Sequence, residues 1–339
     1  MKRKPRRSGG KKLRLAQTSG KIRFRLIAVC IAAFAIVIGS FILKDLINGK
    51  EPGRRPIKTV REVKPAAPKP ATQNLNRPGA APAHMPGPSS PVVPLPPSQT
   101  RVLKQVTLTQ AEIERPKIVF VIDDIGYHLD FEEEIRALGN QVTYAILPRL
   151  PYSEHFGLVG GEMGAEVILH QPLETVDGTI PGKGLITSVM PPEQMIEMLH
   201  GNLATVPNHI GINNHMGSLG TTNPGVMRTL LAELRKNGMI FLDSRTNSKS
   251  IGPEIAAELD MVPLVRDVFL DNQEDKPSVL GQVQQLEPIA RQKGYAIGIG
   301  HYKKNTLEVI ADEIPKLKQK GFAIVTLSKI AVMKERDLL

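Results

Sequence analysis

From Lys117 onwards, short apolar runs rich in β-branched residues alternate with longer amphipathic segments, and this alternation constrains the fold more than any other feature. The short runs predict eight strands, over residues 117–124, 141–148, 165–172, 209–215, 239–245, 261–271, 296–301 and 323–328. The amphipathic segments predict helices over residues 191–205, 224–237, 278–293 and 305–320. A strand followed by a helix, repeated along the chain, implies a parallel sheet with right-handed crossovers.

The number of these units indicates how the sheet is arranged. Seven or eight units in roughly 225 residues fit a closed or nearly closed, distorted α/β barrel better than an open doubly wound sheet. No nucleotide-binding glycine fingerprint opens the first unit, which also weighs against a dinucleotide-binding fold. Gly238, Gly294 and Gly321 each follow a predicted helix, where a left-handed residue is expected to end it.

A basic segment and an apolar run stand at the amino terminus. Residues 1–25 hold eleven Lys and Arg and no acid, and residues 26–43 are uncharged and mostly apolar. Eighteen residues span about 27 Å as a helix, close to the thickness of the bilayer core. Because basic segments stay in the cytoplasm, we expect a single-pass bacterial inner-membrane helix with the C-terminal domain in the periplasm. A cleaved signal peptide is the alternative.

Residues 44–115 predict a linker, and residues 116–339 the barrel domain. Thirteen prolines between Pro52 and Pro97 indicate a semi-extended tether that cannot bury a core. Beyond the basic segment the chain has 33 basic and 33 acidic residues, so we expect no nucleic-acid partner. Cys30 is the only cysteine, which excludes an intramolecular disulfide.

Residues suited to chemistry stand at the carboxyl ends of the predicted strands. In a parallel barrel these ends meet, so side chains far apart in the sequence converge on one site. Carboxylates together with imidazoles suit a divalent metal such as zinc. The candidates are Asp123, Asp124, His170, His215, Asp243, Arg245 and His301.

Five ordered motifs carry a resemblance to a known family. They are VIDDIG at residues 121–126, EVILHQPLE at 166–174, NNHMGS at 213–218, DSRT at 243–246 and IGIGH at 297–301. Together they resemble the divergent polysaccharide deacetylase family, which is related to NodB-type carbohydrate esterases. The resemblance covers about residues 117–330 and implies a distorted barrel with a metal-dependent site.

The resemblance also implies roles for single residues. In the esterases the first of the paired aspartates is the general base and the second binds the metal, which here are Asp123 and Asp124. His170 matches the first of two metal-binding histidines, but Glu174 stands where the second is expected. We therefore expect His215 as the third ligand, with Glu174 as the alternative.

Three further residues complete the expected site. His301 matches the histidine that protonates the leaving group, and Asp243 is expected to orient it. Arg245 would pair with a site carboxylate or hold substrate; alternatively, Asp243 and Arg245 form only a structural ion pair.

The expected function is removal of acetyl groups from a cell-envelope carbohydrate, peptidoglycan being one within reach of the tether. The alternative is an inactive barrel that binds envelope glycan or a partner protein. The missing second histidine and the absence of Trp, which often stacks on sugar rings, favour this alternative. A metal-dependent phosphoesterase is a third class, but no phosphate-cradling glycine loop is evident.

Overall fold

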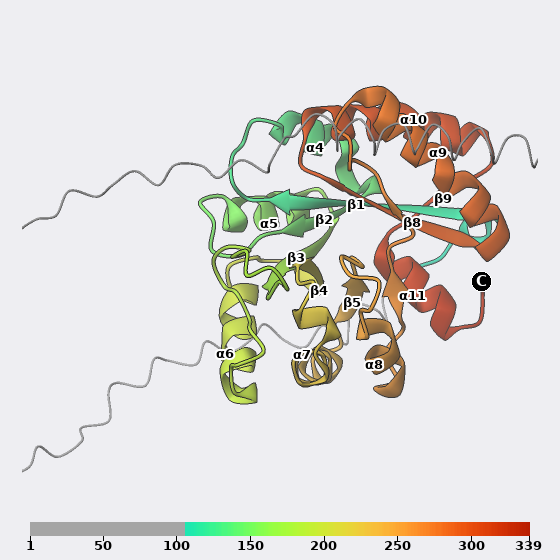
Figure 1. The fold of residues 1–339 in the computed structure, drawn as a ribbon. Coiled ribbons are helices and arrows are strands. Elements are labelled where there is room, and N and C mark those ends of the chain that lie inside the picture. The colour runs from blue at the N-terminus through green and yellow to red at the C-terminus, as the bar shows by residue number, and fades with distance from the viewer. Residues whose placement is uncertain (1–105) are drawn as a thin grey trace, which may run out of the picture. The chain divides into compact units, whose positions relative to one another are not determined.

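The computed structural model describes residues 106–339 (Figure 1). The predicted basic segment, residues 1–25, the predicted membrane helix, residues 26–43, and most of the predicted linker lie outside the described residues. Within residues 106–339, no helix combines the length and the apolar character needed to cross a bilayer.

The centre of the structure is one curled sheet of parallel strands. Its order is β6-β5-β4-β3-β2-β1-β8-β7, and β9 pairs separately with the first residues of β1. The strands are β1 (Lys117–Ile125), β2 (Thr143–Ile146), β3 (Glu166–Leu173), β4 (His209–Met216), β5 (Ile240–Asp243), β6 (Leu264–Val265), β7 (Val268–Phe269), β8 (Tyr295–His301) and β9 (Ala323–Ile324).

The sheet curls until its two edges approach each other. β6 and β7 stand at opposite ends of the strand order, yet only Arg266 and Asp267 separate them in the chain. Two edges joined by two residues cannot lie far apart. No ladder joins β6 to β7 among the described residues, so the predicted α/β barrel is confirmed as a distorted one that stays open at this seam.

Both faces of the sheet are buried, which explains the continuous apolar runs of the strands. In β1, Ile118, Phe120 and Ile122 pack against the surrounding helices. Val119 and Val121 point the other way, into an interior core shared with residues of β8 such as Ile297. Because side chains alternate along a strand, this pattern predicts that Asp123 also points into the barrel.

Helices surround the sheet (Figure 1). The four predicted helices are confirmed to within two residues at each end as α6 (Pro192–Leu203), α7 (Pro224–Lys236), α9 (Lys276–Lys293) and α10 (Lys304–Gln319). Gly238, Gly294 and Gly321 have positive φ angles, as expected for residues that end helices.

Shorter helices were not predicted. They are α3 (Gln110–Glu114), α4 (Glu132–Leu138), α5 (Ser153–Glu162), α8 (Gly252–Glu258) and α11 (Leu327–Glu335), with two 3₁₀ turns at Gly139–Gln141 and Gly220–Thr222. The glycines of α5 hide its helical pattern, and they are there for packing. A side chain at Gly160 would collide with Val167 of β3.

Two strand predictions were wrong in detail. The strand predicted over 261–271 is broken into β6 and β7 at the seam of the barrel. The strand predicted over 323–328 ends at Ile324, and the chain then turns into α11.

Glu166 at the start of β3 explains this turn. Its carboxylate accepts hydrogen bonds from the backbone N–H groups of Leu327, at 2.9 Å, and Ser328, at 3.0 Å. It also accepts one from the Thr143 hydroxyl at 2.9 Å. The carboxylate therefore gives the first N–H groups of α11 a hydrogen-bond acceptor, and its negative charge interacts favourably with the positive end of the helix dipole. Held in this way, α11 closes the amino-terminal end of the barrel, where it packs Leu327, Ile330 and Ala331 into the interior core.

We predict that Glu166→Ala lowers the free energy of unfolding by about 2 to 3 kcal/mol, because it leaves buried N–H groups without a partner. Glu166→Gln keeps one acceptor oxygen and should lose less. Urea denaturation followed by circular dichroism measures both. Equal midpoints for Glu166→Ala and the unmodified chain would refute the capping role.

Candidate metal site

Three side chains bring ligand atoms together at the carboxyl end of the barrel: Asp124 of β1, His170 of β3 and His215 of β4. His215 Nδ1 lies 3.0 Å from His170 Nε2. Asp124 Oδ1 lies 3.3 Å from His170 Nε2 and 3.1 Å from His215 Nδ1. Adjacent ligands of an ion held at 2.0 to 2.2 Å are about 3.0 to 3.5 Å apart, so the triangle has the size of a metal site.

The strand register explains why the two histidines meet. His170 pairs with Asn213 across β3 and β4, and His215 lies two residues beyond Asn213. Residues two apart in a strand point to the same face. His170, Asn213 and His215 therefore share the interior face of the barrel.

Asp124 reaches the site through an irregularity in β1. Between Ile122 and Ile125 the pairing of β1 with β2 gains one residue on the β1 side, which is a β-bulge. Asp124 adopts a left-handed backbone conformation there, with φ of 66°. Neighbours in a regular strand point to opposite faces, whereas here both Asp123 and Asp124 approach His170, at 3.6 and 3.3 Å.

The state of these groups fits a bound cation. Asp124 Oδ1 is buried and has no hydrogen-bond partner among residues 106–339. Burial alone would raise the pKa of Asp124, but the adjacent imidazoles of His170 and His215 hold the pKa far below its ordinary value. Burial likewise opposes protonation of His170, yet the carboxylates of Asp123 and Asp124 raise its pKa. The pocket attracts positive charge, which a divalent ion would supply.

Asn213 prepares His170 as a ligand, a role that the sequence did not suggest. Its side-chain amide donates to Asp123 Oδ1 at 2.9 Å, so its Oδ1 is left to accept from His170 Nδ1 at 2.8 Å. This hydrogen bond places the proton on Nδ1 and directs the lone pair of Nε2 into the site.

Asp123 lies beside the three ligands as a potential base. Only 2% of its surface is exposed, and burial, reinforced by the charge of Asp124, raises the pKa of its carboxyl group. Asp123 pairs directly with His301 across β1 and β8, so both side chains enter the site from neighbouring strands.

His301 is oriented by Asp271. His301 Nδ1 lies 2.8 Å from Asp271 Oδ1, and Asp271 Oδ2 accepts from the His301 backbone N–H and the Thr306 hydroxyl, both at 2.8 Å. Burial disfavours the imidazolium, but Asp271 raises the pKa of His301. Sequence reasoning missed Asp271, although it ends the segment that was predicted as one long strand, and this position at a strand end is the signal that could have found it.

The expectation that Asp243 orients His301 was wrong. The side chains of Ile240 and Leu242 fill the barrel interior, so alternation turns Asp243 to the opposite face. There it accepts from Ser250 Oγ at 2.6 Å and from the Arg245 backbone N–H at 2.7 Å. Ser244 takes the interior position and accepts from Asn213 at 3.1 Å.

The arginine near the site is Arg266, at the seam between β6 and β7. Its guanidinium donates to the backbone oxygens of Ser244, at 2.6 Å, and Arg245, at 3.0 Å. The Arg245 side chain is exposed and forms no ion pair with Asp243 within residues 106–339. A role for Arg245 in holding substrate stays a prediction.

Glu174, the alternative third ligand, is engaged elsewhere. Its Oε2 accepts from the Ser188 backbone N–H at 2.8 Å and the Ser188 hydroxyl at 2.6 Å, which ties the ends of the loop after β3 together. The site assembled by the structure therefore uses His215.

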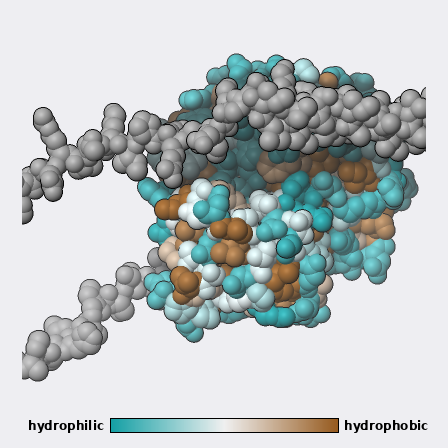
Figure 2. All heavy atoms as spheres, in the orientation of Figure 1, coloured by the Kyte–Doolittle hydropathy of each residue, from teal (hydrophilic) through white to brown (hydrophobic). Residues whose placement is uncertain are grey.

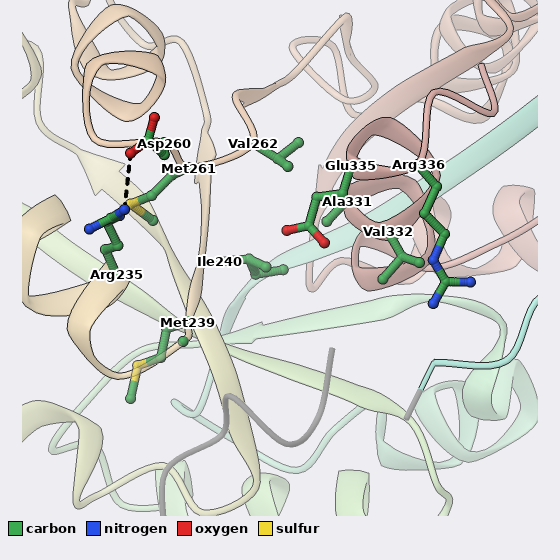
Figure 3. Close-up of a pocket in the computed structure, with 11 residues that line it drawn as sticks. Arg235, Met239, Ile240, Asp260, Met261, Val262, Ala331, Val332, Glu335 and Arg336 are labelled. Atoms are coloured by element: carbon green, nitrogen blue, oxygen red, sulfur yellow. Dashed lines mark hydrogen bonds and ion pairs between the residues drawn. The ribbon is translucent and has the colours of Figure 1, made fainter. Parts of the chain in front are cut away.

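A separate pocket lies at the other end of the barrel (Figure 3). Met239 and Ile240, at the start of β5, and Val332 and Glu335 of α11 line it, and the Arg235–Asp260 ion pair stands at its edge. None of the candidate site residues contributes to it.

Comparisons with known proteins identify the family of the barrel and support its fold. A family model described as divergent polysaccharide deacetylase matches residues 120–331. An uncharacterized protein of Haemophilus influenzae is 32% identical over 209 residues, which cover 62% of this chain and 75% of that protein. The uncharacterized protein YibQ of Escherichia coli is 28% identical over 201 residues, which cover 59% and 63%.

A solved structure supports the fold. An uncharacterized protein from Agrobacterium tumefaciens C58 superposes with a TM-score of 0.63 at 24% identity, over 66% of this chain and 92% of that one. At this identity the likeness shows the barrel fold alone.

If the site holds a divalent ion, we predict that Asn213→Ala weakens its binding, probed with Zn²⁺, by about 10- to 100-fold, because His170 loses the hydrogen bond that fixes its tautomer. Asn208→Ala, which removes an asparagine contact to Gly157 away from the site, is the control. Isothermal titration calorimetry with Zn²⁺ measures both. Unchanged affinity in Asn213→Ala would show that His170 needs no such partner.

Proposed function

Because this chain belongs to the divergent polysaccharide deacetylase family, we propose that its barrel removes acetyl groups from a cell-envelope carbohydrate with the help of a divalent metal ion. The observation that carries this proposal is the triangle of Asp124, His170 and His215, flanked by Asp123 and by the His301–Asp271 pair. A bound ion such as zinc supplies Lewis acidity, which polarises a carbonyl group and lowers the pKa of water.

Asp123 has the properties of a general base. Its carboxylate is buried, its raised pKa makes it a stronger base than an exposed aspartate, and Asn213 holds it in place. In the proposed reaction Asp123 removes a proton from the attacking water.

His301 has the properties of the matching acid. Asp271 fixes the ring through Nδ1 and favours its protonated form, and Nε2 faces the site 3.9 Å from Asp124 Oδ2. In the proposed reaction Nε2 donates its proton to the departing amine or alcohol. The two groups thus have pKa values shifted in the direction that their roles require.

The place of action is also a proposal. The expected helix over residues 26–43 would hold the barrel on the periplasmic side of the inner membrane, and the Pro-rich linker would let it reach envelope glycans such as peptidoglycan.

A binding module remains the second candidate. It is favoured by Glu174, which replaces the second histidine of the esterase motif and closes a loop with Ser188. In this case the barrel would bind an envelope glycan or a partner protein without hydrolysing it.

Substitutions of the paired aspartates separate the two candidates. We predict that Asp124→Ala abolishes both Zn²⁺ binding and acetate release from acetylated chitooligosaccharides or peptidoglycan. Asp123→Asn should keep the metal but lose about 100- to 10,000-fold in turnover, because only the base is removed. Calorimetry and an enzymatic acetate assay provide the two readouts. If no protein in the series releases acetate, and Asp124→Ala binds glycan like the unmodified chain, the binding module is correct.

A second pair of substitutions tests the partner of His301. We predict that Asp271→Asn lowers turnover by about 100-fold while the Zn²⁺ affinity stays unchanged, because the acid loses its orientation. Asp243→Asn should leave turnover within a few-fold and lower the free energy of unfolding by about 1 kcal/mol. Steady-state kinetics and urea denaturation distinguish them. A larger loss of turnover in Asp243→Asn than in Asp271→Asn would show that Asp243, and not Asp271, orients His301.

A further inference from the structure

Large exposed apolar side chains are concentrated at one end of the barrel. The face drawn in Figure 2 mixes hydrophobic and hydrophilic residues, and isolated exposed apolar residues are normal. Seven large hydrophobic residues of the described chain are exposed, and five of them lie on two loops. We name these five the apolar rim: Tyr127 and Leu129 on the β1–α4 loop, and Val176, Ile180 and Val189 on the β3–α6 loop. The other two are Leu158 on α5 and Leu339.

The apolar rim borders the metal site. In a parallel barrel the loops that follow the strands all lie at the carboxyl end. Gly126 begins the first loop two residues after Asp124, and Glu174 begins the second four residues after His170. The two loops are also neighbours, because a methyl group added at Gly182 would lie 4.0 Å from the Tyr127 hydroxyl.

The β3–α6 loop holds its apolar side chains outward in a fixed arrangement. The backbone N–H of Ile186 donates to the Pro172 oxygen, and Glu174 holds Ser188. Gln171 and Asn202, both fully buried, donate to the Gly184 oxygen at 2.9 and 2.7 Å. Between these contacts Val176 is 67% exposed and Ile180 77%, and Val189, which directly follows Ser188, is 86% exposed.

The β1–α4 loop is fixed by Tyr302. The Tyr302 hydroxyl accepts from the Phe131 backbone N–H at 3.0 Å, and its ring stacks on His128 at 5.1 Å between centroids. Since both loops are held by specific contacts, the exposure of the rim is built into the fold.

The composition of the apolar rim favours lipid over protein as its partner. Protein interfaces concentrate their binding energy in Trp, Tyr and Arg, whereas four of the five rim residues are aliphatic. Amphipathic surfaces that enter a bilayer place apolar side chains at the boundary between headgroups and acyl chains.

The chain also provides a route to a bilayer. It carries the apolar run over residues 26–43, which we expect to be a membrane helix. The tether joins the barrel at α3, beside the amino-terminal end of β1, where Lys117 Nζ donates to the Ile113 oxygen at 2.8 Å. The roughly 60 linker residues that precede the described chain, 44–105, would reach up to about 190 Å if extended as polyproline helix, against a barrel radius of gyration of about 17 Å. This length lets the opposite end of the barrel turn toward the membrane.

We propose that the apolar rim docks on the membrane surface, so that the metal site acts on a saccharide attached to a lipid. The docking rests on the rim and the expected tether, and the substrate class rests also on the proposed deacetylase function. In this arrangement the loops enter the acyl boundary while the ligands stay at the level of the headgroups, where the sugar of a lipid-linked glycan lies.

The absence of Trp from the chain permits a direct test. Ile180→Trp places a single fluorescent reporter in the rim of the full-length chain, and Leu158→Trp places one on α5 as the matched control, at a residue that is 49% exposed. Both proteins are reconstituted in vesicles of phosphatidylethanolamine and phosphatidylglycerol, with or without lipids brominated on their acyl chains.

The reporter in the rim should shift its emission to shorter wavelength and lose most of its intensity with brominated lipid, while the Leu158→Trp reporter keeps its emission. Adding Val176→Ser and Val189→Ser to Ile180→Trp should reduce the quenching. Equal emission of the two reporters in both kinds of vesicle would overturn the proposal. So would a shift that occurs only when purified peptidoglycan is added, since it would assign the rim to the cell wall.

This readout is independent of the proposed chemistry. Quenching requires neither metal nor turnover, so a failed docking test leaves the deacetylase proposal standing. Conversely, if the chain docks on the membrane but releases no acetate, the membrane-docking proposal stands and only the assignment of a lipid-linked saccharide as substrate is wrong.

Discussion

The bulge in β1 between Ile122 and Ile125 is the constraint on which the candidate site depends. A regular strand would send Asp123 into the barrel and Asp124 out of it, because neighbouring side chains point to opposite faces. The extra residue and the positive φ of Asp124 turn both carboxylates toward His170. A left-handed conformation costs a non-glycine residue of order 1 kcal/mol or more, and such strain is typical of functional sites. The same bulge thus brings two carboxylates into the site, Asp124 beside His170 and His215, and Asp123 beside Asn213.

A buried network of hydrogen bonds around Asn213 holds the side chains of the candidate site in place. Asn213 contacts His170, Asp123 and Ser244, so one amide side chain links three strands of the sheet. Each of its contacts uses a defined donor or acceptor, which removes the ambiguity of both the amide and the imidazole. Hydrogen bonds within the protein therefore hold His170 and Asp123 in place, which is the support that neighbouring residues give to metal-binding histidines.

Periodicity and strand ends in the sequence were sufficient for the barrel, its four long helices and the positions of Asp124, His170 and His215. Their limit was the detail of side-chain direction. In the structure Ile240 and Leu242 face the interior, so Asp243 faces away from it. The sequence shows the alternation of side chains but not which of the two faces is the interior one. Arg266 was missed because the predicted strand over 261–271 ran across the seam where the sheet breaks, whereas Asp271 was missed although it stood at the end of that predicted strand. The turn into α11 depends on Glu166, which is 161 residues distant in the chain from Leu327, and no local pattern reports such a contact.

The candidate ligands Asp124, His170 and His215 come from three strands, and His215 stands in for the histidine that the resemblance places four residues after His170. A histidine four residues after His170 would approach the ion from the same chain segment, whereas His215 approaches from the next strand, beside Pro172 in register. In this chain Glu174 stands where the resemblance places a second histidine, and its carboxylate fastens the β3–α6 loop through Ser188. That fastening holds Val176, Ile180 and Val189 on the outside of the site. The departure from the esterase motif at Glu174 thus lies on the same loop as Val176, Ile180 and Val189 of the exposed rim.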